Sequence, residues 1–107
     1  MKNFDFILKL AEIIPSFSQL HAYCDKAEIF QSNFPEESAS NARKALEWMV
    51  KQHLAMAEVT LDRHETLNDM LRRPQIDAFV NGDWQMERDM QTVRKIGNYA
   101  SHTGAQQ

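Results

Sequence analysis

The chain has few of the residues that interrupt helices. It contains three glycines and three prolines among 107 residues. Sheet-rich folds use more turn residues than this, because each strand has to be followed by a chain reversal. The scarcity therefore predicts an all-α protein. A chain of this length suffices for one domain with one modest core and is too short for two.

Cysteine and long apolar segments are also scarce. Cys24 is the only cysteine, so no intramolecular disulfide can form, which is typical of a reducing compartment. No segment is long and apolar enough to span a bilayer. The charges of Asp5, Lys9 and Glu12 near the start are unlike a signal-peptide core. We therefore expect a cytoplasmic protein without a membrane contact.

An excess of positive charge is missing as well. The net charge is −3, whereas a simple basic nucleic-acid-binding module would be positive. Residues 1–37 hold three basic and six acidic residues, and the remainder holds nine of each. Any anion-binding surface is therefore expected as a local patch in the second part. A phosphate-cradling glycine loop and a Walker-type lysine are absent too, so we expect neither nucleotide hydrolysis nor a cofactor.

Apolar residues spaced three and four apart predict four main helices and two short ones. Pro15 and Pro74 interrupt this pattern, while Ser16 and Thr66 are candidate N-caps. A proline and two acidic residues favour a helix start within residues 33–37. The expected helices cover residues 4–14, 16–31, 67–71, 75–80 and about 84–101, and a further helix starts within residues 33–37 and ends at about residue 57. We also expect a polar loop at residues 58–65 and a turn at residues 81–83.

The two longest expected helices each carry an apolar stripe for the core. Gly97 lies within the second stripe, where glycine costs about 1 kcal/mol relative to alanine. Close approach of another helix is the expected reason, and close approach of a ligand is the alternative. The first stripe contains Ala42, Leu46, Met49, His53 and Met56. The second contains Met86, Met90, Val93, Gly97 and Ala100.

Three other features have a structural and a functional interpretation. His53 lies within the first stripe, and we expect a buried, hydrogen-bonded side chain and not a ligand. Trp48 points away from that stripe, where it either covers a second helix or anchors a partner protein. His21, Cys24 and Asp25 share one helical face, but a structural zinc site has four ligands and no second cluster is visible. We therefore expect no metal site.

The segment from Arg94 to His102 holds the candidate chemistry. Arg94, Asn98 and His102 follow one another at i+4, which places them on one shoulder of a helix. Arginine binds anions and histidine exchanges a proton near neutral pH. Together with the asparagine they could hold a phosphodiester and deprotonate a ribose hydroxyl. The spacing alone favours the other interpretation, in which Arg94 and Asn98 only bond to neighbouring helices.

Two stretches resemble a known family. Residues 42–51, preceded by Phe34-Pro35, and residues 93–102 are similar to the small helical domain of uncharacterised function at the amino end of many type I restriction enzyme R subunits. Residues 67–71 resemble the short helix of that domain, and residues 1–6 resemble its natural amino terminus. The resemblance covers most of the chain. It implies a HEPN-like helical bundle.

Many HEPN proteins are metal-independent ribonucleases that act as dimers. Their usual signature is an arginine followed by a histidine after four to six residues, whereas seven residues separate Arg94 from His102. Lys95 fits the spacing but is not arginine. The resemblance thus suggests Arg94 and His102 as catalytic candidates. The binding candidates within the two similar stretches are Asn98, Arg43, Lys95 and Trp48.

The favoured hypothesis is a non-catalytic accessory or interaction domain of a type I restriction system, a bacterial defence against foreign DNA. Its partners would be other domains or subunits of the complex, with weak DNA or RNA contact and homodimerisation left open. One alternative is a metal-independent HEPN endoribonuclease that acts as a dimer. The other is a self-standing helical regulator or antitoxin-like protein. The abrupt end after residues 103–107 favours one domain at the amino end of a larger protein over a short protein with a frayed tail.

Overall fold

The computed structural model describes residues 3–106, and side chains as far as residue 101. These residues form an all-α bundle, which confirms the predicted fold class. No helix in this part of the chain combines the length and apolar character needed to cross a membrane. The helices are α1 (Phe6–Ile13), α2 (Phe17–Ile29), α3 (Pro35–Met56), α4 (Leu67–Leu71), α5 (Pro74–Val80) and α6 (Trp84–Gln106).

Local signals explain most of the helix starts. Pro35 occupies the first turn of α3, as predicted. Thr66 caps α4 in a reciprocal pair with Asp69, because the Asp69 amide donates to the Thr66 hydroxyl at 3.1 Å and the Thr66 amide donates to the Asp69 carboxylate at 3.0 Å. The predicted Ser16 cap is wrong. Its backbone is already helical at φ −61° and ψ −21°, whereas a capping residue is normally extended.

The predicted turn between α5 and α6 is confirmed. Asn81 and Gly82 both have left-handed backbones, at φ 50° and φ 79°. Asparagine and glycine are the residues that adopt this region most readily. Helix α6 then continues to Gln106, five residues beyond the predicted end near residue 101.

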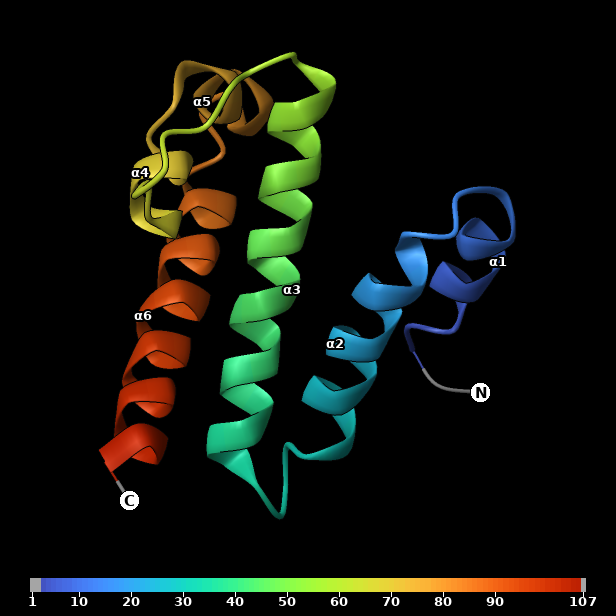
Figure 1. The fold of residues 1–107 in the computed structure, drawn as a ribbon. Coiled ribbons are helices and arrows are strands. Elements are labelled where there is room, and N and C mark those ends of the chain that lie inside the picture. Colours follow the sequence, from blue (N-terminus) through green and yellow to red (C-terminus); the bar gives the residue numbers. More distant parts are fainter. Residues whose placement is uncertain (1–2, 107) are drawn as a thin grey trace.

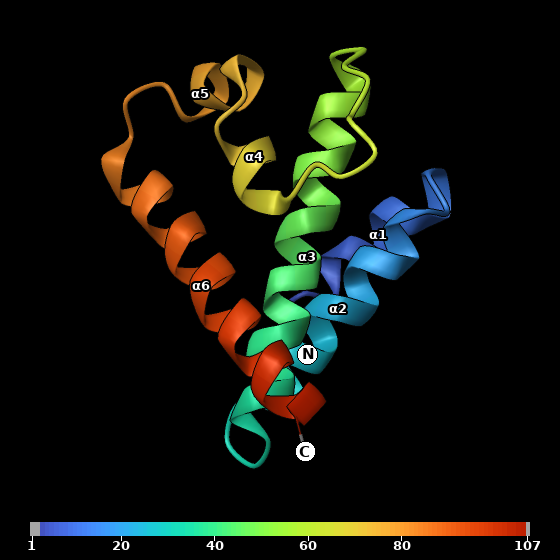
Figure 2. The same cartoon turned by 60° about the vertical axis from the view of Figure 1, so that its left-hand side comes forward.

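Helix α3 is the central element of the bundle. It packs against α2 on one side and α6 on the other, and α1 packs only on α2 among the described helices. Figure 1 shows this order, with α1 outermost and α3 in the middle. In Figure 2 the short helices α4 and α5 fill the space where α3 and α6 diverge. The bundle therefore has two separate interfaces along α3.

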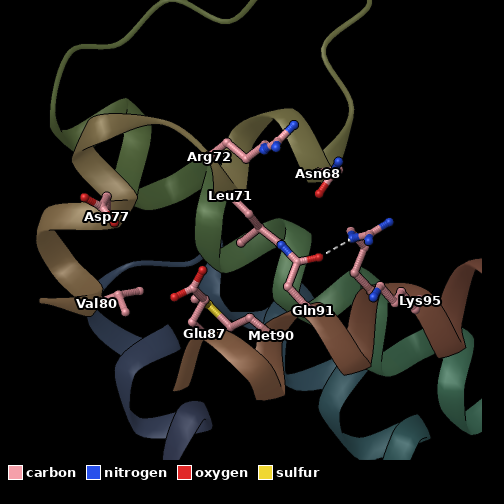
Figure 3. A pocket seen from close by; sticks show the side chains of 10 residues that line it. Asn68, Leu71, Arg72, Asp77, Val80, Glu87, Met90, Gln91 and Lys95 are labelled. Atoms are coloured by element: carbon pink, nitrogen blue, oxygen red, sulfur yellow. Dashed lines mark hydrogen bonds between the residues drawn. The ribbon is translucent and has the colours of Figure 1, made fainter. Parts of the chain in front are cut away.

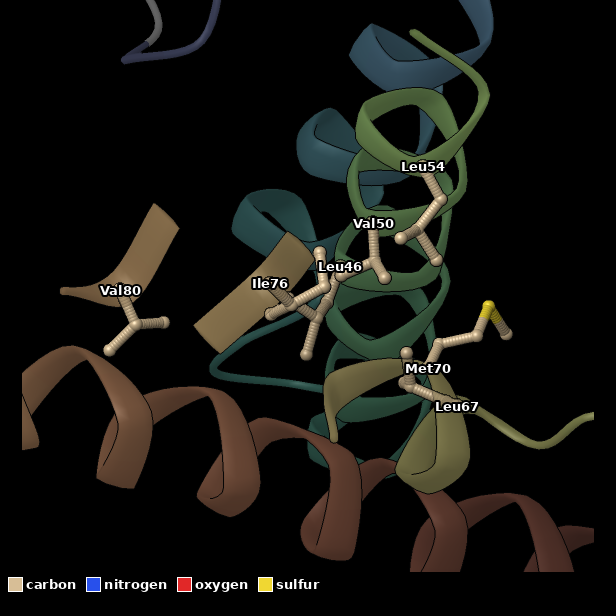
Figure 4. Packing of buried hydrophobic residues seen from close by; sticks show 7 residues of the cluster. All are labelled: Leu46, Val50, Leu54, Leu67, Met70, Ile76 and Val80. Carbon is tan, nitrogen blue, oxygen red and sulfur yellow. The ribbon is translucent and has the colours of Figure 1, made fainter. Parts of the chain in front are cut away.

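Each interface has its own hydrophobic cluster. The larger cluster joins α3, α4 and α5, and Figure 4 shows Leu46 and Val50 of α3 beside Ile76 of α5, with Val80 further out. Its buried residues are Leu46, Val50, Leu54, Leu67, Met70, Ile76 and Val80. The smaller cluster joins α1, α2 and α3 through Ile7, Leu20, Cys24 and Ala45.

The predicted core stripe of α3 is partly wrong. Met49 is 46% exposed and Met56 is 79% exposed, whereas Val50 and Leu54 are buried. The reason is that α3 has a neighbour on each side and therefore two buried arcs. A single averaged stripe cannot follow both arcs, so it includes the buried Leu46 together with the exposed Met49 and Met56.

The predicted stripe of α6 agrees better with the structure. Gly97 and Ala100 are buried, and Met90 and Val93 are partly buried against the larger cluster. Met86, at the start of the stripe, is 36% exposed. Helix α6 packs mainly on one long neighbour, so one stripe describes it.

Candidate functional site

The candidate residues of α6 lie on a helix that is fixed by a very close contact with α3. A Cβ atom at Gly97 would collide with the Cβ of Arg43 and would lie 2.9 Å from the carbonyl oxygen of Ala39. Only glycine allows this approach without a shift of the neighbours. The contact confirms the prediction that another helix approaches Gly97. It also places Arg43, a binding candidate, directly against α6.

Arg43 is half-buried beside this contact. Its Nη1 lies 3.9 Å from the Glu47 carboxylate, which in turn lies 3.9 Å from Lys51 Nζ. The Nε of Arg43 is buried and has no hydrogen-bond partner among the described residues. The weak ion pair and the orphaned Nε show that the guanidinium is held by packing more than by polar contacts.

Arg94 is held by its own helix. Its Nε donates to the Gln91 side-chain oxygen at 2.8 Å. The side chain thus leans toward the preceding turn, whereas His102 lies two turns further along α6, about 12 Å away along the axis. The side chain of His102 falls outside the described part of the structure. Within one chain, Arg94 is directed away from the turn that carries His102.

Asn98 lies between them on the same shoulder of α6. Its side chain is half-buried and makes no hydrogen bond with the described residues. One turn further on, the Ser101 hydroxyl lies 3.1 Å from the Ser40 hydroxyl of α3. The alternative of bonds from Arg94 and Asn98 to neighbouring helices is therefore not what the structure shows. Ser101 makes such a bond instead.

Arg94 and Lys95 line a cavity of about 560 Å³ between α4, α5 and α6. Figure 3 shows Lys95 on one side of this cavity, below Arg72, which follows the last residue of α4. Sequence reasoning did not join Arg72 to Arg94, because no local pattern relates residues so far apart. The packing of α4 against α6 brings both to one cavity.

Trp48 does not belong to this group. Its ring lies 5.1 Å from the ring of Phe17 in α2, and the side chain is half-buried against the smaller cluster. Of its two interpretations, the covering of a second helix describes the structure.

The prediction of a buried, hydrogen-bonded His53 is wrong. The His53 ring is half-buried and lies 5.1 Å from the ring of Phe79, because α5 folds back over the end of α3.

On the candidate metal face of α2, His21 and Cys24 have different surroundings. His21 Nε2 lies 3.3 Å from the carboxylate of Asp5. Cys24 is buried, and burial raises the pKa of its thiol, which keeps the sulfur protonated at neutral pH. No group of three or more histidine, cysteine, aspartate or glutamate side chains in the described part of the chain could hold a metal ion.

A second hollow lies over the uncovered face of α3. It is an apolar groove of about 260 Å³ between α2 and α6. Its floor contains Ala42 and Met49, two members of the predicted core stripe. Phe4, Met90 and Val93 contribute further apolar surface. Part of the stripe that sequence reasoning assigned to the core thus lines an open groove, whereas His53 and Met56 lie outside it.

No protein-family model matches this chain, and no curated protein or solved structure matches it either. The comparisons therefore identify no family. A function has to rest on the arrangement of the described residues and on the resemblance of the two sequence stretches.

Proposed function

We propose that this chain is a non-catalytic interaction domain of a type I restriction enzyme R subunit, and that it docks an apolar helix of another domain or subunit in the groove over α3. The observation that carries the proposal is the groove itself. It exposes a stripe of apolar side chains with the spacing of a buried helix face. Hollowed apolar surfaces of this kind are typical protein-interaction sites.

The groove has the shape that a helix needs. Helices α2 and α6 form its two walls and α3 forms its floor, so an inserted helix would pack against three neighbours. Met49, 46% exposed on the floor, is unbranched and adapts to irregular partners. An aspartate, Asp89, lies at its edge and suits a basic residue on the rim of the partner helix.

The direction of Arg94 supports a non-catalytic role. Its guanidinium is bonded to Gln91 and leans away from the turn of His102. For catalysis on one phosphodiester, the histidine that acts as the base and the arginine that binds the anion both have to lie within hydrogen-bond distance of it. The bond to Gln91 thus holds Arg94 in a direction that supports a non-catalytic role. The resemblance supplies the remaining part of the proposal, which is that the partner belongs to a restriction complex.

The test is co-purification of this chain with the R-subunit nuclease and translocase domains and the methyltransferase from the same genome. Met49→Glu should weaken the complex by more than about tenfold, because docking would bury an unpaired carboxylate. Ile29→Glu is the matched control, since Ile29 is 49% exposed and does not line the groove. Equal binding by wild type and Met49→Glu would contradict the proposal, provided that both are folded by circular dichroism.

A second assay addresses the catalytic alternative directly. We expect no cleavage of a labelled, mixed-sequence RNA in the absence of metal ions. Cleavage that Arg94→Ala and His102→Ala each abolish, with Arg88→Ala still active, would show a ribonuclease and overturn the non-catalytic part of the proposal. Arg88 is an exposed arginine of the same helix, so it controls for the lost charge.

A further inference from the structure

The cavity between α4, α5 and α6 has an unusual distribution of charge. Arg72, Arg94 and Lys95 line it, and none of the three forms an ion pair with a carboxylate of the described residues. By contrast, Arg43 Nη1 and Lys51 Nζ each lie 3.9 Å from the Glu47 carboxylate. Arg73, the next residue after Arg72, is bonded to Glu65 through both Nε and Nη2. Three unpaired cations at one cavity indicate a site for an anion.

The guanidinium of Arg94 is oriented by a neighbouring side chain and has free donors for such an anion. Gln91 accepts the hydrogen bond from its Nε and fixes its plane, while its two Nη groups remain without a protein partner in the described residues. The planar fork of arginine matches two oxygens of a phosphate. Arg72 and Lys95 supply the second and third positive charges. Three positive charges at one cavity suit a dianion better than a single carboxylate, because each added cation strengthens the attraction.

The other end of the same cavity is acidic. Asp77 of α5 and Glu87 of α6 line it, and Figure 3 shows both on the side opposite to Lys95. Val80 and Met90 contribute apolar surface to the cavity. A nucleic-acid strand that continued through the cavity would bring further phosphates toward these carboxylates, which would repel them. The arrangement therefore favours a small ligand with only one anionic end.

We infer that this cavity binds a small phosphate monoester that carries an amino group at its other end. The phosphate lies between Arg72, Arg94 and Lys95, and the ammonium lies against Asp77 and Glu87. The cavity volume of about 560 Å³ is within the range of small-molecule sites. This cavity shares Met90 with the groove over α3, but its charged residues are not part of that groove and the inference does not depend on the proposed docking function.

The inference can be tested by titrating the whole chain in ¹⁵N–¹H correlation spectra with glucosamine 6-phosphate and glucose 6-phosphate. These probes differ only by an amino group in place of a hydroxyl. Amide shifts confined to α4, α5 and the first half of α6 are expected, with tighter binding of the amino sugar. Arg94→Ala should weaken both ligands about tenfold, as loss of charge-assisted hydrogen bonds does. Asp77→Asn should remove most of the preference for the amino sugar.

Arg88→Ala is the matched control, because it removes one positive charge of α6 outside the cavity. It should leave both affinities unchanged. Equal weakening by Arg88→Ala and Arg94→Ala would overturn the site, since general charge attraction would then explain the binding. Absence of cavity shifts with either sugar at millimolar concentration, equal affinity for the two sugars, or a clear preference for a single-stranded oligonucleotide would also overturn it.

Discussion

The two ends of the bundle differ in how they use their apolar residues. Around the second half of α3, seven side chains from three helices are buried together, and the partly buried Met90 and Val93 of α6 cover them. Around α1, only Ile7 is buried, although α1 is rich in apolar residues. The exposed apolar residues of α1 and its C-terminal neighbour are Phe6, Leu8, Leu10, Ile13 and Ile14.

This difference shows that the number of neighbouring helices decides how many side chains of a helix are buried, more than its apolar content does. Helix α1 touches one other helix, so one stripe at most can be covered. The short helices α4 and α5 are flanked by both α3 and α6, so each buries two residues despite its length. Stability is therefore expected to concentrate at the end of the bundle where four helices meet.

The largest effect is expected from removing the centre of the larger cluster. Leu54 is completely buried, and Leu54→Ala should reduce the free energy of unfolding by about 4 kcal/mol. Ile7→Ala, in the smaller cluster, should reduce it by about 2 kcal/mol, because α1 can shift to fill the space. Urea denaturation followed by circular dichroism measures both. A larger loss for Ile7→Ala would reverse the comparison.

A smaller loss is expected at the contact between α3 and α6. Gly97→Ala places a methyl group against Arg43 and the backbone of Ala39, which should lower the unfolding free energy by about 1–2 kcal/mol after the gain in helix propensity. Thr92→Ala, on the exposed face of the same helix, is the control. Equal or higher stability of Gly97→Ala in thermal melts would mean that the helices can separate at no cost.

The loop that closes the larger cluster should make stability depend on pH. Hydrogen bonds from Arg73, together with the backbone amide of Asp62, hold the pKa of Glu65 below its ordinary value. A carboxylate with a lowered folded pKa stabilises the fold above its unfolded pKa of about 4.3, and this contribution is lost as the pH falls through the folded pKa. We expect the denaturation midpoint to fall on acidification below that value. Glu65→Gln should show a shallower fall, and an identical pH profile would contradict the role of this pair.

The smallest effect is expected on the exposed surface of α1. Ile13 is 80% exposed, so Ile13→Ser should change the unfolding free energy by less than about 0.5 kcal/mol. Differential scanning calorimetry at several protein concentrations measures this change. A loss of several kcal/mol that grows with concentration would show that Ile13 is buried between copies of the chain, and α1 would then not be the weakly packed end.

Much of the secondary structure could be predicted from local residues. The residues of α4, the proline start of α3 and the left-handed turn at 81–83 are all as predicted. In the candidate site, the glycine contact of α6 was also predictable, because a glycine inside a helix is unfavourable unless something approaches it. The joining of Arg72 to Arg94 was not predictable, since it depends on how α4 is placed against α6.

The sequence by itself determined the fold class, the approximate helix bounds and the need for a close contact at Gly97. Caps, turns and helix propensities act within a few residues, so one sequence contains them in full. Only the tertiary structure decided which faces of α3 are covered and which basic residues share a cavity. Those features depend on contacts between segments that are distant along the chain, and no local spacing encodes how many neighbours a helix will have.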